Sequence, residues 1–88
     1  MMTIGLLVAA SVAATRPLPA DVTRFLDRRS QCLHWAGEEP FDSARSEQIA
    51  AAVRRLRCGS IEADERALRR RYVAHPDVSS ALSQEDAQ

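Results

Sequence analysis

The two cysteines, Cys32 and Cys58, constrain the fold of this 88-residue chain more than any other feature of its sequence. An even pair in so small a chain favours a disulfide, because a thin core gains stability from a crosslink. In the chain-entropy model, closing a loop of about 26 residues stabilises the fold by roughly 3.5 kcal/mol. Two alternatives stay open, namely a pair of buried thiols and a metal site. The metal site is disfavoured because neither cysteine belongs to a CxxC unit.

An uncharged apolar run near the N-terminus indicates export. Residues 4–14 (IGLLVAASVAA) are too few to span a bilayer, which takes about 20 apolar residues, but they match the apolar region of a signal peptide. Cleavage sites follow Ala13, Ala14 or Ala20, although no basic residue precedes the run. We therefore expect residues 1–20 to hold a signal peptide and the start of a periplasmic or secreted chain, with no stable transmembrane segment. The alternative is a buried first helix of the mature fold.

Beyond this run the apolar pattern is helical, and no alternating stretch is long enough for a strand. We predict an all-α domain over residues 21–82 with three main helices and one disulfide, followed by a flexible tail over 83–88. Pro76 either ends the third helix or starts a short fourth helix over 77–82. Asp21 is expected to cap the first helix, with Arg28 and Arg29 facing water. Its apolar stripe comprises Val22, Phe25, Leu26, Cys32 and Leu33.

The second and third helices are separated by the residues that follow Cys58. Asp42 or Ser43 is expected to cap the second helix, Gly59 to end it, and Ser60 to cap the third. The apolar residues predicted to face inward are Ile49, Val53 and Leu56, with Ala50 and Ala52 beside them, and then Ile61, Leu68 and Tyr72.

A disulfide limits how the first two helices can be joined. If the first helix ran to Ala36 and turned back tightly, Cys58 would lie about 15 Å or more from Cys32. A disulfide needs Cα atoms within about 7 Å. We therefore expect the first helix to stop near residues 32–35, and the segment through Pro40 to run back in extended form. Pro40 favours extended conformations before it, and Gly37 permits a change of direction.

That connecting segment reads CLHWAGEEPFD from Cys32 to Asp42. Together with the second cysteine after an Ile/Val/Leu helix and the stretch that ends in Arg71-Tyr72, it resembles a family of small exported proteins of proteobacteria, over residues 24–76. The resemblance implies a periplasmic helical domain with a disulfide, and it supplies no activity or catalytic residues. A weaker similarity links residues 58–72 to lysozyme-inhibitor-like envelope proteins, although the spacing differs. This second similarity implies a candidate inhibitor role.

The connector also carries groups with catalytic or metal-binding chemistry. On a continued helix, His34 and Glu38 would share a face, with Glu39, Asp42 and His75 as further ligands or acid-base groups. Gly37 and Pro40 argue against such a helix, and neither an HExxH motif nor a nucleophile elbow is present. We expect aromatic residues to fill the core and acidic ones to cap helices or pair with arginines; an exposed recognition surface is the alternative. The candidate residues are His34, Trp35, Gly37, Glu38, Glu39, Pro40, Phe41 and Asp42, with Trp35 and Phe41 in the core.

A cluster of arginines marks the third helix and is a candidate anion-facing surface. It comprises Arg66, Arg69, Arg70 and Arg71. Because Glu62 and Glu65 stand four residues before Arg66 and Arg69, intrahelical pairing on a solvated face is expected. The chain has no net charge, since its 12 arginines balance 12 acidic residues, so nucleic acid is not an expected partner.

These observations predict a small exported helical protein of the cell envelope that binds another envelope protein. We expect no catalysis, no metal and no cofactor. Two alternatives remain, a metal-dependent activity through His34, Glu38 and Glu39, and a purely structural envelope protein. Whether those three side chains converge within about 5 Å distinguishes the first alternative from the binding function.

Overall fold

The computed structural model describes residue 5 and residues 17–84 of the chain, and its regular secondary structure is helical. Along this part of the chain there is no strand. The elements are α1 (Ala20–Ala36), α2 (Ser43–Arg55), the short 3-10 turn η1 (Cys58–Ser60), α3 (Ile61–Arg71) and α4 (Pro76–Ser83). The all-α prediction is confirmed, and so is a short fourth helix, which begins at Pro76.

Two predicted segments fall largely outside the described residues. Apart from Gly5, the apolar run that we interpret as a signal peptide lies there, and so do residues 85–88 of the predicted tail. Ser83, which we placed in that tail, is instead the last residue of α4.

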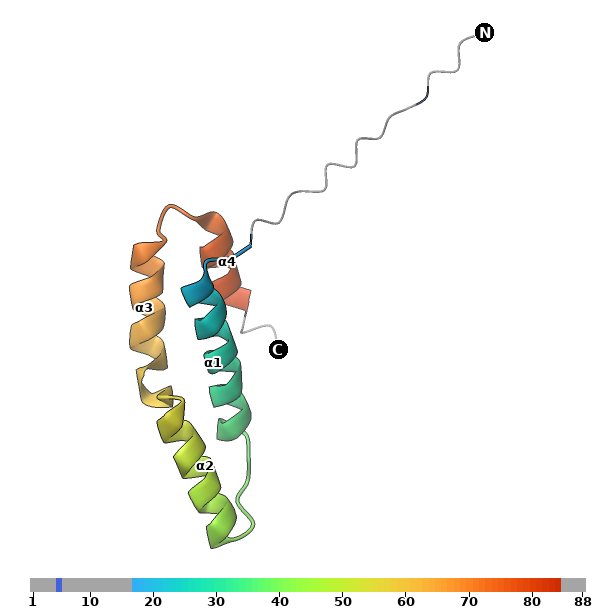
Figure 1. Cartoon of the computed structure of the whole chain (residues 1–88), viewed down its shortest axis with the longest axis vertical. Helices are drawn as coiled ribbons and strands as arrows, with labels where there is room; N and C mark the ends of the chain where they lie inside the picture. Colours follow the sequence, from blue (N-terminus) through green and yellow to red (C-terminus); the bar gives the residue numbers. More distant parts are fainter. Residues whose placement is uncertain (1–4, 6–16, 85–88) are drawn as a thin grey trace.

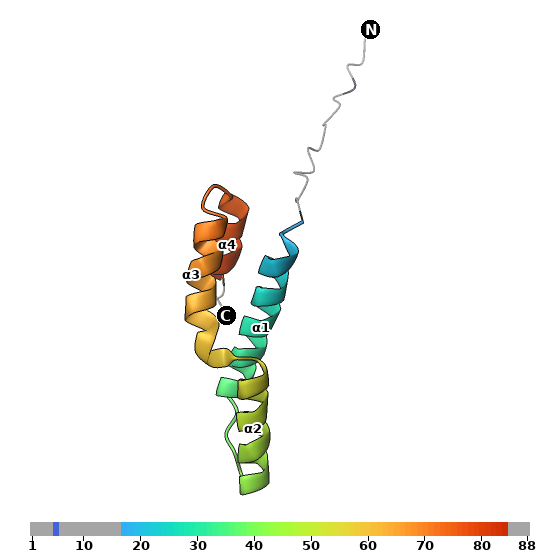
Figure 2. The same ribbon diagram turned by 60° about the vertical axis from the view of Figure 1, so that its left-hand side comes forward.

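The helices α1, α3 and α4 pack side by side, and α2 projects beyond them. α1 and α3 run antiparallel to each other, and α4 returns along the end of the pair where α1 begins (Figure 1). α2 lies beyond the far end of α1 and leads through η1 into α3. A second view shows the same arrangement (Figure 2).

The core lies where α1, α3 and α4 meet. Its buried members are Val22, Phe25, Leu68, Val78 and Leu82, and the partly buried Leu18, Leu26, Ile61 and Tyr72 pack against them. Val22 and Phe25 are three residues apart on α1, a spacing that places both on one helical face. Burying each large apolar side chain stabilises the fold by about 1.5 to 3 kcal/mol, so this cluster is the principal apolar contribution.

The solvent face predicted for α1 was partly wrong. Arg29 is only 4% exposed, and the side chain of Arg28 is also largely covered. Leu33, expected on the apolar stripe, is 52% exposed. The reason is that Arg29 lies four residues after Phe25 and three before Cys32, and so belongs to the buried face, where it pairs with Glu65 of α3.

The disulfide between Cys32 and Cys58 joins α1 to η1, with a Cα to Cα distance of 5.6 Å. The bridge was predicted correctly, but the path between the cysteines was not. α1 continues to Ala36, and the connector of residues 37–42 runs onward, away from the end of α1, before α2 returns (Figure 1). Six extended residues reach about 20 Å and thirteen helical residues span about 20 Å, so the return brings Cys58 level with Cys32.

Several helix ends also differ from expectation. Asp21 lies in the first turn of α1, and Pro19 is the N-cap, because its carbonyl oxygen accepts the backbone N–H groups of Val22 and Thr23. Asp42 caps α2 as predicted, accepting the backbone N–H of Arg45 at 2.8 Å. Gly59 does not end α2.

Arg57 makes the turn after α2 in place of that glycine. It adopts the left-handed conformation, with φ of 52°, directly after the C-cap Leu56. Ser60 stands at the N-cap position of α3, but its side chain makes no cap hydrogen bond.

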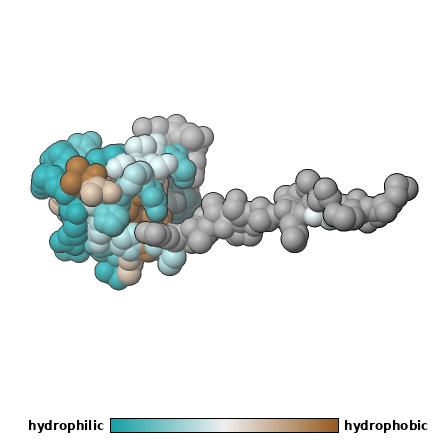
Figure 3. Space-filling model, turned by 90° about the horizontal axis from the view of Figure 1, so that it is seen from above, coloured by the Kyte–Doolittle hydropathy of each residue, from teal (hydrophilic) through white to brown (hydrophobic). Residues whose placement is uncertain are grey.

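One face of the described residues is mainly polar. Figure 3, a view from above, shows a largely hydrophilic face with small hydrophobic areas. Val73, in the turn between α3 and α4, is 79% exposed.

Candidate functional site

A groove of about 660 Å³ lies between the second half of α1 and the facing side of α3. It exists because the helices differ in length: α4 has eight residues, about 12 Å, whereas α1 has 17, about 25 Å. Beyond the end of α4, no other helix of residues 17–84 covers the α1–α3 pair. The lining residues are Arg29, Cys32, Leu33, Ala36, Cys58, Ile61, Glu62, Glu65, Arg66, Arg69, Leu82 and Ser83.

Apolar groups and the disulfide form part of the groove wall. Cys32, Leu33 and Ala36 share a face of α1, and Ile61 stands opposite on α3. Leu33 is half exposed, so its side chain remains available for contact. Both half-cystines also line the groove, and the crosslink therefore holds its two walls together at one end.

At the α4 end, the charged groups of the groove are bonded to one another. Arg29 donates to Glu65 at 2.8 Å and to the carbonyl oxygen of Leu82 at 3.0 Å. Glu65 also accepts from Arg69 Nε at 3.1 Å, which confirms the predicted intrahelical pair, and Arg69 donates to Ser83 at 3.2 Å. This network ties together α1, α3 and the end of α4.

The predicted pair between Glu62 and Arg66 does not form. Both side chains are exposed on the groove wall, and within residues 17–84 neither takes part in an ion pair. The groove therefore has bonded charged groups near α4 and, one helical turn apart on α3, two charges of opposite sign that form no ion pair within residues 17–84.

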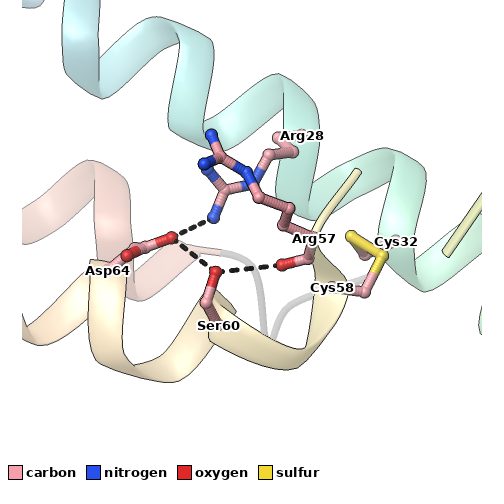
Figure 4. Close-up of a disulfide and its surroundings, with 6 residues drawn as sticks. All are labelled: Arg28, Cys32, Arg57, Cys58, Ser60 and Asp64. Carbon is pink, nitrogen blue, oxygen red and sulfur yellow. Dashed lines mark hydrogen bonds and ion pairs between the residues drawn. A yellow bond between two sulfur atoms is a disulfide. The ribbon is translucent and has the colours of Figure 1, made fainter. Parts of the chain in front are cut away.

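Beside the disulfide, a carboxylate connects α1 to η1 (Figure 4). Asp64 accepts a hydrogen bond from Arg28, and the Ser60 hydroxyl lies 2.9 Å from the same carboxylate and 3.1 Å from the carbonyl oxygen of Arg57. The hydrogen bond from Arg28, followed by that of Ser60, lowers the pKa of Asp64 below its ordinary value of 3.8. These contacts support the bridged end of the groove.

The connector does not fill the core as predicted. Phe41 is 83% exposed, and Trp35 is only half buried, with the guanidinium of Arg45 over its ring at 5.2 Å. The end of α1 and the connector lie away from the core, which forms where α1, α3 and α4 meet. Glu38 pairs with Arg45 at 2.9 Å, as expected of an acidic residue that meets an arginine.

The residues proposed for a metal site meet only in part. His34 Nε2 lies 3.5 Å from Glu38 Oε1, but Arg45 shares that carboxylate, and a guanidinium there opposes a divalent cation. Glu39 is exposed. Over the described residues, no three His, Cys, Asp or Glu side chains are grouped so as to hold a metal ion.

The arginine cluster of α3 is divided among several partners. Arg71 pairs with Asp21 at 2.7 Å, and the Tyr72 hydroxyl donates to the same carboxylate at 2.8 Å. The hydrogen bond from Tyr72 is the main cause that lowers the pKa of Asp21, and that of Arg71 adds to it. Arg70 is exposed. Arg69 and Arg71 of this cluster are therefore already paired with carboxylates.

Sequence reasoning missed the structural roles of Arg29 and Asp21. A signal for Arg29 was available, since its spacing from Val22, Phe25 and Cys32 follows the buried face of α1. The contact of Asp21 with Arg71 and Tyr72 joins residues 50 and 51 positions apart, and no local pattern indicates it.

Comparison with family models, with curated proteins and with solved structures finds no match to this chain. Within the part of the chain that the structure describes, none of the helices combines the length and apolar character needed to cross a membrane. The disulfide is compatible with a periplasmic or extracellular location.

Proposed function

We propose that this chain is a small exported, disulfide-bonded helical protein that binds another protein of the cell envelope and performs no catalysis. The observation that carries this proposal is the groove, which presents the half-exposed Leu33 beside the crosslink. Concave surfaces with apolar walls and few polar groups are the usual places where proteins take up a partner.

The chemistry of the groove supports binding over catalysis. A general acid or base needs a free proton-transfer group next to the reacting atom. Here Glu65 is held between Arg29 and Arg69, so its carboxylate serves the fold, and the other carboxylate of the lining, Glu62, is exposed to solvent. The resemblance of the connector to small exported proteobacterial proteins favours the same compartment, and an inhibitor of an envelope enzyme is one form that such binding would take.

Export is tested by expressing the full chain with a C-terminal epitope tag in a Gram-negative host. Cells are fractionated, and free thiols are trapped in whole cells with a thiol-alkylating reagent that shifts electrophoretic mobility. We expect the chain in the periplasmic fraction with neither cysteine alkylated. Recovery in the cytoplasm with both thiols free would remove the envelope location from the proposal.

Binding is tested by crosslinking the tagged chain in intact envelopes and comparing three forms. Wild type is expected to capture a defined envelope protein, and Leu33→Glu is expected to lose it. Val73→Glu is the matched control, because Val73 is also exposed but lies outside the groove. Equal capture by all three forms would show that the groove is not the binding site.

A further inference from the structure

We propose that the projecting end of the molecule binds a basic segment of a protein partner, with one cationic side chain of that segment held beside Phe41. The projecting end comprises most of the connector and the first six residues of α2, residues 38–48 (Figure 1). Its depression shares no lining residue with the groove. The inference therefore adds a second binding surface to the proposed function and can be tested separately from it.

The depression at this end lies against an exposed aromatic ring. It has a volume of about 270 Å³, and Phe41, which is 83% exposed, forms part of its wall. The other lining residues are Glu38, Asp42, Ala44, Arg45 and Gln48. The depression is less than half the size of the groove, so it suits a single side chain of a partner rather than a helix.

The projecting end carries an excess of negative charge. Residues 38–48 contain four carboxylates and one guanidinium, which leaves three negative charges. The guanidinium, that of Arg45, pairs with Glu38 at 2.9 Å. In the described part of the chain, no cationic side chain pairs with the other three carboxylates, which are all exposed and belong to Glu39, Asp42 and Glu47. A cationic group of the partner would compensate charge that the chain itself leaves unpaired.

The ring of Phe41 adds a second attraction for a cation. The face of an aromatic ring attracts a Lys or Arg side chain that lies within about 6 Å of its centre, and the carboxylate of Asp42 lines the same depression. The chain already makes one such contact nearby, between Arg45 and the ring of Trp35. Phosphate groups of nucleic acids and anionic lipids would meet like charge here, so we assign the surface to a basic protein segment.

The depression is held in shape by bonds within the projecting end. Asp42 accepts the backbone N–H of Arg45 at 2.8 Å, and the Arg45 guanidinium donates to Gln48 at 3.0 Å while it pairs with Glu38. These contacts tie the connector to α2 on both sides of the depression. Binding therefore costs little additional ordering of the protein.

The test uses the oxidised full chain and two short peptides of glycine and serine as probes. One peptide carries three arginines, and the other carries three glutamates at the same positions. We expect the arginine peptide to bind, to perturb the NMR signals of Phe41, Asp42 and Gln48, and to bind more weakly as the salt concentration rises. The glutamate peptide is expected not to bind.

Variants of the projecting end separate the contribution of the ring from that of the charges. Phe41→Leu keeps an apolar side chain but removes the aromatic face, and it is expected to weaken binding of the arginine peptide by about two- to fivefold. Glu39→Gln and Glu47→Gln are each expected to weaken it by up to about fivefold. Asp27→Asn, at an exposed position of α1, makes the same change in net charge and is the control, with no effect expected.

Three results would overturn the inference. The first is equal binding of the two peptides, and the second is an NMR footprint outside residues 38–48. The third is equal weakening by Asp27→Asn and Glu47→Gln, because overall charge would then attract the peptide. If any of these is found while capture in envelopes still depends on Leu33, the proposed function stands and only the second surface is removed.

Discussion

Arg29 in α1 donates a hydrogen bond of 3.0 Å to the carbonyl oxygen of Leu82, near the C-terminus of α4 and 53 residues later in the chain. The same guanidinium donates to Glu65 of α3 at 2.8 Å. One nearly buried side chain therefore joins all three packed helices. Because Leu82 and Ser83 form one end of the groove, Arg29 also sets where the groove begins.

Replacing Arg29 with alanine is expected to destabilise the fold by about 2 to 4 kcal/mol. Removing Arg29 takes the donor from the carbonyl oxygen of Leu82 and from Glu65 Oε1, while Glu65 Oε2 keeps Arg69, and a covered acceptor without its donor is costly. Chemical denaturation followed by circular dichroism measures the loss. Arg24→Ala, at an exposed position of the same helix, is the control and should change stability by less than about 0.5 kcal/mol. Similar losses in both variants would mean that the network contributes little.

The disulfide is expected to supply a large share of the stability of the domain. Reduction, or the double substitution Cys32→Ser with Cys58→Ser, should lower the free energy of unfolding by roughly 3.5 kcal/mol, because the loop is no longer closed in the unfolded chain. Thermal unfolding with and without reductant measures the effect. Reductant should not change the melting of the double variant, and a wild type that melts equally in both conditions would contradict the role of the bridge.

The sequence was sufficient to predict the elements of the fold that depend on local patterns. Helical spacing located α1 to α3 and the core positions Val22, Phe25 and Leu68, and the cysteine pair indicated the bridge. The fourth helix was one of two alternatives at Pro76. A distance limit between Cys32 and Cys58 required an offset between the first two helices, but it did not determine the direction of the connector. The same offset is reached by a segment that runs onward before α2 returns, and that is the observed path.

The candidate site could not be predicted from the sequence in the same way, because it depends on contacts between distant residues that no local pattern specifies. The spacing of Arg29 places it on the buried face of α1, but the carboxylate that pairs with it there, Glu65, lies 36 residues away in the sequence. The groove arises from the different lengths of α4 and α1, together with the face on which α4 packs. Phe41 was assigned to the core on its hydrophobicity alone, whereas the projection of α2 leaves it at the surface.

The half-buried position of Trp35 determines how much stability the fold is expected to lose when this side chain is removed. Truncating a fully buried indole would lower the free energy of unfolding by about 3 to 5 kcal/mol. Here part of the Trp35 side chain is exposed, and the guanidinium of Arg45 lies over its ring. We expect Trp35→Ala to destabilise the fold by about 1 to 2 kcal/mol, from lost apolar contact and the cation–π interaction. Urea denaturation followed by circular dichroism gives the value, and Phe41→Ala serves as the exposed control, with little effect expected. A loss above about 3 kcal/mol for Trp35→Ala would show that the ring is more buried than described.

The contact between Asp21 and Tyr72 is expected to make stability depend on pH at both extremes. The hydrogen bond from Tyr72 lowers the pKa of Asp21 from 3.8, so this contribution is present above that pH and is lost as the pH falls through the folded-state pKa. The hydrogen bond to Asp21, together with burial, raises the pKa of Tyr72 from 10.0, so its contribution is present below that pH and is lost as the pH rises.

Melting temperatures of wild type and Tyr72→Phe from about pH 2 to about pH 11 test this contact. We expect the melting temperature of the variant to fall less steeply at acid pH. At alkaline pH we expect it to lack the fall that ionisation of Tyr72 causes in the wild type. Because the chain has one tyrosine, absorbance also follows the ionisation of its phenol directly. Identical pH profiles for the two proteins would show that the contact is not formed in solution.

Arg57, which precedes Cys58, holds the left-handed backbone conformation with φ of 52° and ψ of 50°. This conformation costs an L-residue roughly 1 to 2 kcal/mol, whereas glycine adopts it freely but loses more backbone entropy on folding. We therefore expect Arg57→Gly to raise the free energy of unfolding by about 0.5 to 1 kcal/mol, as a higher denaturation midpoint. Arg57→Ala removes the same guanidinium but keeps the Cβ, so it should give no gain; equal stability of the two variants would show that backbone strain at residue 57 is not what limits this turn.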